Sequence, residues 1–232
     1  MTTLPVPAPE VWLEDDMARS VRAYPLVGLT LGVLLALGVS LLSGLPPLLQ
    51  GALGLGLWLL LTGALHFDGF CDVADAAFAS VTPAERGRIL GDVSVGAFAL
   101  AAASVLLLVK LAALPHVQST WLVVILLLSR TLVVWPLAHF RLSGASRLGR
   151  GARLSKAEAN LPLLLGLGLS GAFALVFLEL GSYFALLLSA GLSVLGVAAW
   201  LERRLDGLNG DAYGALIELS EAVMLVTLVA LA

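Results

Sequence analysis

Charged residues are scarce in this sequence, and their scarcity decides its class. Only 12% of the 232 residues are Asp, Glu, Lys or Arg, 59% are hydrophobic, and the mean hydropathy is +1.00. A soluble domain usually carries about 25% charged residues. The net charge of −3 provides no basic surface of the kind that nucleic-acid binders use, so no nucleic-acid partner is expected. We therefore expect the lipid bilayer to be the main partner of this chain.

Cysteine and histidine are almost absent. The single cysteine, Cys71, excludes a disulfide within the chain and a metal site built of cysteines, and it is expected to pack rather than react. The three histidines, His66, His116 and His139, are too scattered for a zinc motif. Residues 1–24 also lack the basic stretch and apolar core of a signal peptide, so the first apolar run is expected to be a retained span.

Long apolar runs, by contrast, are abundant. A spanning helix needs roughly 20 mostly apolar residues. Seven stretches qualify: about 26–43, 48–65, 95–114, 119–138, 161–178, 182–200 and 214–231. Glycines recur within them and are interpreted as positions where helices pack closely. The sequence predicts an all-α polytopic membrane protein, with about seven transmembrane helices in a single integral membrane domain that covers residues 1–232.

Lysine and arginine mark one side of the predicted bundle. They occur before the first span and in three loops, at 66–94, 139–160 and 201–213, whereas the opposite turns near 44–47, 115–118 and 179–181 have none. Because basic residues favour the cytoplasmic side, we predict a cytoplasmic N-terminal segment 1–24, three cytoplasmic loops and an external C-terminus. Two basic residues fall inside spans. Lys110 is expected to snorkel outward, and Arg130 to pair with a carboxylate inside the bundle.

Three acids follow the second span at helical spacing. Asp68, Asp72 and Asp75 stand at i, i+4 and i+7, which places them on one helix face. Like charges on one face repel each other, and Mg²⁺ shared with substrate phosphates would compensate them. A solvated acidic loop is the alternative, but the interleaved phenylalanines and alanines disfavour it. We predict a metal site here, with His66 beside it as a base or a further ligand.

A second acidic group comprises Asp211, Glu218 and Glu221, and the two glutamates lie in the apolar run of the last span. Ionisable residues inside a membrane are costly, which makes them functional candidates. The alternative is that the glutamates merely pair with Lys110 or Arg130. Gly210 ends a glycine-containing turn that permits close backbone approach to a ligand.

Asp92 precedes the third span on the same side as the other acids. It is either a functional acid or an N-cap for the following helix. Loop cations on that side are candidate phosphate ligands, although the rule for basic residues alone would also place them there. They are Arg86, Arg88, Arg147, Arg150, Arg153 and Lys156. Together these groups suit phosphoryl or nucleotidyl transfer, in which two divalent ions clamp a diphosphate.

The acidic cluster carries a family resemblance. His66-Phe67-Asp68-Gly69-Phe70-Cys71-Asp72-Val73-Ala74-Asp75 resembles the His-x-Asp-Gly-x-x-Asp-x-x-Asp motif of the cobalamin synthase family (adenosylcobinamide-GDP ribazoletransferase). Other matches follow in the family's order: Tyr24-Pro25-Leu26-Val27-Gly28, Asp92 with Gly96, Lys110, and Gly210-Asp211-x-x-Gly214-Ala215 with Glu218-Leu219 and Glu221. The sequence departs from the family at Ala76, where glycine is usual, and at Gly91 and Ser94, where the family tends to have basic residues.

The resemblance implies a reaction. The family joins adenosylcobinamide-GDP to α-ribazole, or its 5′-phosphate, releases GMP and requires Mg²⁺. By resemblance, Asp68, Asp72 and Asp75 bind Mg²⁺ with help from Asp211, and His66 or Asp92 takes the hydroxyl proton. Substrate or cofactor contacts are expected from Arg86, Arg130, Gly210, Glu218 and Glu221. The resemblance also implies the prokaryotic cytoplasmic (inner) membrane with the active site facing the cytoplasm, and it leaves a homo-oligomer open.

Two other functions stay open from the residues alone. A CDP-alcohol phosphatidyltransferase would use similar acids, but its motif fits only at Asp72-Val73-Ala74-Asp75-Ala76. A cation transporter would carry its acids near mid-membrane rather than at one boundary. Release of GMP from the corrinoid pair, rather than CMP from a CDP-alcohol, distinguishes the ribazoletransferase hypothesis from the phosphatidyltransferase hypothesis.

Overall fold

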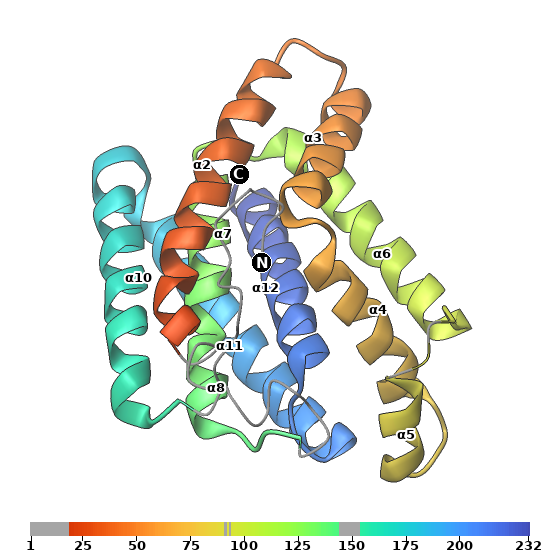
Figure 1. Ribbon diagram of the computed structural model, residues 1–232. Coiled ribbons are helices and arrows are strands. Elements are labelled where there is room, and N and C mark those ends of the chain that lie inside the picture. The colour runs from red at the N-terminus through yellow and green to blue at the C-terminus, as the bar shows by residue number, and fades with distance from the viewer. Residues whose placement is uncertain (1–18, 91, 93, 144–153) are drawn as a thin grey trace, which may run out of the picture.

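The computed structural model describes residues 19–90, 92, 94–143 and 154–232, and these residues form a bundle of helices (Figure 1). The elements are η1 (Val21–Ala23), α2 (Tyr24–Leu41), α3 (Pro47–Thr62), α4 (Leu65–Phe78), α5 (Pro83–Ile89), α6 (Ala97–Ala113), η2 (Leu114–His116), α7 (Trp121–Leu132), α8 (Val134–His139), α10 (Lys156–Phe177), α11 (Leu180–Leu205) and α12 (Gly210–Leu231). Within the described ranges, paired extended backbone is confined to an isolated bridge between Leu142 and Leu208. The predicted all-α class is confirmed.

Six spans in the described part of the chain are long and apolar enough to cross a membrane. They are Val21–Leu41, Ala97–His116, Trp121–His139, Lys156–Phe177, Leu180–Leu205 and Gly210–Leu231. These six correspond to six of the seven predicted spans, and the protein is an integral membrane protein. The remaining predicted span, 48–65, differs in form, and the described residues hold seven spans only if a bent pair of helices counts as one. It contains α3, which pairs with α4 as two helices bent by 93° at a short break.

The break between α3 and α4 is built by two consecutive residues in left-handed backbone. Gly63 has φ 62° and Ala64 has φ 53°. Their N–H groups bond back to Leu60 and Leu59 of α3, which closes that helix, and the Asp68 N–H then bonds to the Ala64 carbonyl as α4 begins. Alanine in this conformation costs about 1–2 kcal/mol, so tertiary packing has to hold it. Residues 66–94, predicted to be a loop, therefore include two helices, α4 and α5.

The centre of the bundle is formed by α7 and α12, with α2 and α10 on one side and α4 and α6 on the other (Figure 1). Nearly every residue of α7 is buried. Glycines allow α2 to approach it closely. A Cβ added to Gly28 would lie 2.5 Å from the Leu126 carbonyl oxygen, and one added to Gly32 would lie 2.7 Å from the Val123 Cα. These short distances confirm the packing interpretation of the two glycines. Close backbone contact matters in a membrane, because apolar lipid does not drive helices together as water does.

Basic residues from separate loops meet at one end of the bundle. Arg86 of α5 donates to the Arg204 carbonyl at the end of α11. Arg141 pairs with Asp206, which follows α11, at 3.3 Å. The same end of Figure 1 carries α5, the start of α10 and the start of α12. The described parts of these loops thus lie at one end of the bundle, and the compartment that this end faces stays a prediction.

Candidate functional site

Helix α4 has two chemically opposite faces. One face carries Asp68, which is exposed, and Asp72 and Asp75, which are half-buried. The other face is buried and apolar and includes Phe70 and Val73. The i, i+4, i+7 spacing therefore lies on a real helix, as the sequence predicts.

A glycine contact joins the acidic face of α4 to the start of α12. A Cβ added to Gly69 would lie 2.8 Å from the Asp211 Cα, and one added to Gly214 would lie 3.0 Å from the His66 carbonyl oxygen. The two helices thus run antiparallel with their backbones almost touching. Because Gly69 follows Asp68 directly, this contact brings Asp211, 142 positions further along the chain, beside the acids of α4.

Asn209 is a site residue that was not among the predicted ones. Its side-chain oxygen accepts from the Ala212 N–H at 2.9 Å, which caps α12, and its side-chain nitrogen donates to Asp211 at 2.8 Å. Asparagine directly before an apolar helical run is a recognised N-cap pattern, and that pattern is the signal that predicts this role. Asn209 therefore fixes both the start of α12 and the orientation of the Asp211 carboxylate.

The three carboxylates of Asp68, Asp72 and Asp211 lie close enough for their charges to act on one another. Within the described ranges, none of the three forms an ion pair with Lys or Arg. In the same part of the chain, no three His, Cys, Asp or Glu side chains converge closely enough to hold a metal ion alone. Mg²⁺ usually takes one or two carboxylates and completes its shell with water and substrate phosphates, so this donor set fits that ion with a diphosphate present.

The remaining acids of the cluster have other partners. Asp75 accepts hydrogen bonds from the Gly96 and Ala99 N–H groups, at the start of α6. Asp92 is exposed, and its carboxylate accepts from the N–H and the hydroxyl of Ser94. Asp92 thus bonds to Ser94, and the carboxylate that accepts the N–H bonds at the start of α6 is that of Asp75.

A buried ionic network lies deeper in the bundle. The Lys110 Nζ lies 2.5 Å from Glu218 and 2.7 Å from Glu221, and Arg130 pairs with Glu221. His66 is 4% exposed, and its Nδ1 lies 3.5 Å from an Arg130 nitrogen. Pairing of Arg130 with a carboxylate is confirmed. The expectation that Lys110 snorkels outward is wrong, because its side chain is 2% exposed and bound to two glutamates.

The network also places four predicted site residues. Glu218, Glu221, Arg130 and His66 are all buried, and the two glutamates pair with the two cations, as the alternative interpretation held. The structure brings these four residues together but does not open them to the acidic face of α4. Their predicted contact with substrate or cofactor stays a prediction.

Arg86 and Gly210 take different positions. Arg86 is 6% exposed, and its two terminal nitrogens donate to the carbonyls of Arg204 and Ala79. It therefore ties α5 to the ends of α4 and α11, and its predicted contact with a phosphate stays a prediction. Gly210 is the half-buried first residue of α12. Three further predicted cations, Arg147, Arg150 and Arg153, lie outside the described residues.

Comparison with known sequences identifies the family of this chain. The family model described as Cobalamin-5-phosphate synthase matches residues 1–229. The chain belongs to this family. Its relatives include the adenosylcobinamide-GDP ribazoletransferases of Deinococcus radiodurans (41% identical; 97% of this chain, 81% of the relative), Desulfitobacterium hafniense (36%; 97% and 92%) and Stutzerimonas stutzeri (40%; 98% and 94%). No solved structure matches the chain. Membership makes the protein a transferase of cobalamin biosynthesis.

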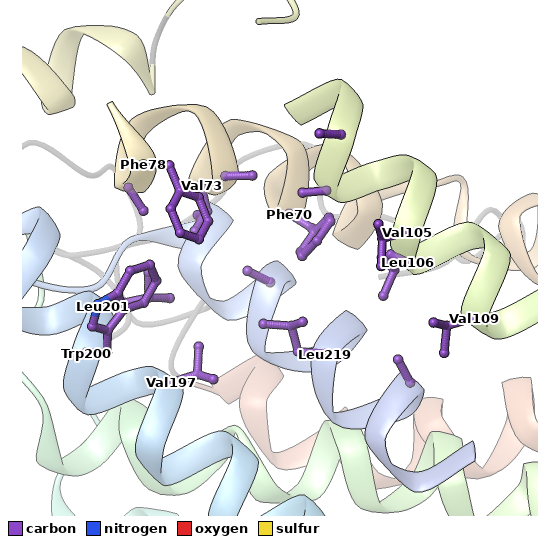
Figure 2. Close-up of a pocket in the computed structure, with 16 residues that line it drawn as sticks. Phe70, Val73, Phe78, Val105, Leu106, Val109, Val197, Trp200, Leu201 and Leu219 are labelled. Carbon is purple, nitrogen blue, oxygen red and sulfur yellow. The ribbon is translucent and has the colours of Figure 1, made fainter. Parts of the chain in front are cut away.

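An apolar groove of about 540 Å³ lies behind the acidic helix of this family member (Figure 2). Side chains from α4, α6, α11 and α12 line it, including Phe70, Val105, Val197 and Leu219. At one end the rings of Phe78 and Trp200 lie 5.6 Å apart. Because the groove uses the face of α4 opposite the acids, the same helix separates an apolar surface from a polar one.

The glycine contact at Gly69 gives a first prediction. Substituting Gly69 by alanine adds a Cβ that meets backbone of Asp211, so α4 and α12 have to separate. We expect the thermal midpoint in detergent to fall by several degrees, because overpacking costs about 1–3 kcal/mol. The matched control is Gly56→Ala in α3, where an added Cβ meets nothing within 4 Å. The control gains up to about 1 kcal/mol of helix propensity and keeps or raises the midpoint. Equal midpoints for the two variants would show that the close contact is not there.

Proposed function

We propose that this protein joins adenosylcobinamide-GDP to α-ribazole, or its 5′-phosphate, and releases GMP in an Mg²⁺-dependent reaction. Family membership and the names of the relatives support the substrates. One structural observation carries the location: the Gly69 contact places Asp211 against the acidic face of α4. There Asp68, Asp72 and Asp211 repel one another and have no cation partner in the described part of the chain, a situation that a divalent ion relieves.

In this proposal the ion would take its carboxylate ligands from among Asp68, Asp72 and Asp211, with water and the substrate diphosphate completing its shell. Asn209 orients Asp211 through its side-chain hydrogen bond. Bound Mg²⁺ would neutralise the diphosphate and stabilise the charge that develops on the leaving oxygen. The ribazole hydroxyl forms a P–O bond to the phosphorus that carries the corrinoid side chain. The P–O bond to GMP breaks, and its electron pair leaves with GMP.

The hydroxyl proton needs an acceptor. We assign this role to Asp92, because it is exposed and lies four residues before Gly96, whose N–H bonds to Asp75 of the acidic helix. His66 is buried beside Arg130, so we assign it to the ionic network instead. The acids lie on the side of the bundle that gathers the basic loops, which supports a site facing the cytoplasm at the prokaryotic inner membrane.

The test is direct. Purified protein is incubated with adenosylcobinamide-GDP, α-ribazole and Mg²⁺, and GMP is measured against the corrinoid product. We expect GMP and product in equal amounts, with no turnover when a chelator removes the metal. CMP release from a CDP-alcohol, with no GMP from the corrinoid pair, would overturn the proposal in favour of a phosphatidyltransferase. GMP release that persists in the chelator would overturn the metal dependence alone.

A further inference from the structure

The start of α6 is capped by a residue from another helix. Its own N-cap residue, Gly96, has no side chain, and helix N-termini leave backbone N–H groups unsatisfied. Asp75 of α4 fills this role with both oxygens. Oδ2 accepts from the Gly96 N–H at 2.6 Å, and Oδ1 accepts from the Ala99 N–H at 2.8 Å. A carboxylate at this position also complements the positive end of the helix dipole.

Gly96 is required by this contact for reasons of space. Its φ of −86° and ψ of 177° suit any residue, so its backbone conformation does not demand glycine. A Cβ there would lie 2.5 Å from Asp75 Oδ1 and 2.8 Å from the carboxyl carbon. The third aspartate of the acidic cluster and the glycine ahead of α6 therefore form one joint between α4 and α6.

We propose that Asp75 is a positioning residue rather than a metal ligand. It fixes the start of α6 and, through it, the position of Asp92, four residues before Gly96. The ion-binding role is left to Asp68, Asp72 and Asp211, whose carboxylates lack such backbone bonds from α6. The part of this inference that concerns Asp92 as proton acceptor rests on the proposed function, whereas the joint itself does not.

The first experiment uses metal-free, substrate-free protein. Cys71→Ser removes the one cysteine, and Val95→Cys then places a spin label at an exposed position beside Gly96. We expect Asp75→Ala and Gly96→Ala each to raise the mobility of the label and to lower the thermal midpoint by about 4 °C. The double variant should match the single variants, because either change breaks the same joint. Asp75→Asn keeps one acceptor oxygen and should recover part of the loss, and Asp72→Asn should leave the label unchanged.

The second experiment separates positioning from ligation. Mn²⁺ binding, measured by electron paramagnetic resonance as a probe for the Mg²⁺ site, should be unchanged in Asp75→Ala and weakened about tenfold or more in Asp72→Asn. Turnover of Asp75→Ala should show a kcat lowered about tenfold with an unchanged KM for both substrates. Weakened Mn²⁺ binding in Asp75→Ala, with an unchanged label, would overturn the proposal. If the wild type binds no Mn²⁺, the metal proposal fails, and the label and midpoint measurements still decide the joint.

Discussion

Replacing Asp72 by asparagine is expected to reduce GMP release about a thousandfold or more while the protein stays inserted and folded. Metal-ion stabilisation of transition-state charge is worth several kcal/mol, and each 1.4 kcal/mol is about tenfold in rate. The fold should keep its stability, because the like charges of Asp68 and Asp211 repel that of Asp72, and the substitution removes this repulsion. Without the ion, the thermal midpoint of the variant should equal or exceed that of the wild type. Turnover and midpoint measured on the same purified sample test both statements.

Asp206→Asn is the matched control, since it makes the same chemical change at the same end of the bundle. Asp206 is exposed, pairs with Arg141 at 3.3 Å, and has a φ of 56°, which asparagine tolerates. A surface pair of this kind contributes about 0–1 kcal/mol, so its turnover should stay within about twofold of the wild type. If Asp72→Asn turns over substrate as fast as the wild type, the assignment of Asp72 as a metal ligand is wrong. Loss of fold together with activity would make Asp72 a structural residue.

Much of the architecture follows from hydropathy, because membrane spans are long and their apolar composition is a local property. The exception is the second predicted span. A count of apolar residues runs smoothly through Gly63 and Ala64, yet both adopt left-handed backbone and turn the chain by 93°. Glycine readily adopts this conformation, but alanine does so only when tertiary packing holds it. The break is therefore invisible to any window average.

The acidic site likewise has features that local sequence spacing predicts and features that depend on distant residues. Helical spacing predicts that Asp68, Asp72 and Asp75 share a face, and the structure confirms it. The different partner of Asp75 could not be predicted, because its hydrogen-bond donors lie 21 and 24 residues further along the chain. Lys110 was misplaced for a similar reason. Its position late in a span suggests snorkelling, but glutamates more than a hundred residues away reach it inside the bundle.

Lys110→Met is expected to destabilise the bundle strongly. The side chain is 2% exposed, contacts two glutamates, and has its Nζ 4.4 Å from the centre of the Trp58 ring. Methionine matches its length without its charge, so Glu218 loses its cation while Glu221 keeps Arg130. Breaking a buried pair costs about 3–5 kcal/mol, and we expect the thermal midpoint to fall by about 10 °C.

The double variant Lys110→Met/Glu218→Gln should recover most of that loss. It removes the uncompensated charge of Glu218. Replacing both members of a buried ion pair by uncharged residues often changes the free energy of unfolding little. Lys156→Met is the matched control, because Lys156 is exposed at the start of α10 and should tolerate the same change. A double variant as unstable as the single one would show that Lys110 acts by packing against Trp58 and not by balancing Glu218.

The same pair of variants links the network to the acidic face. His66, at the start of α4, lies beside Arg130, and its carbonyl faces Gly214 of α12, so the network borders the contact that positions Asp68 and Asp211. Loss of Lys110 should therefore lower turnover as well as the midpoint, and the added Glu218→Gln change should restore both together. Recovery of stability without recovery of turnover would mean that Glu218 itself serves the reaction, as the sequence alone suggested, and that its pairing with Lys110 is only part of its role.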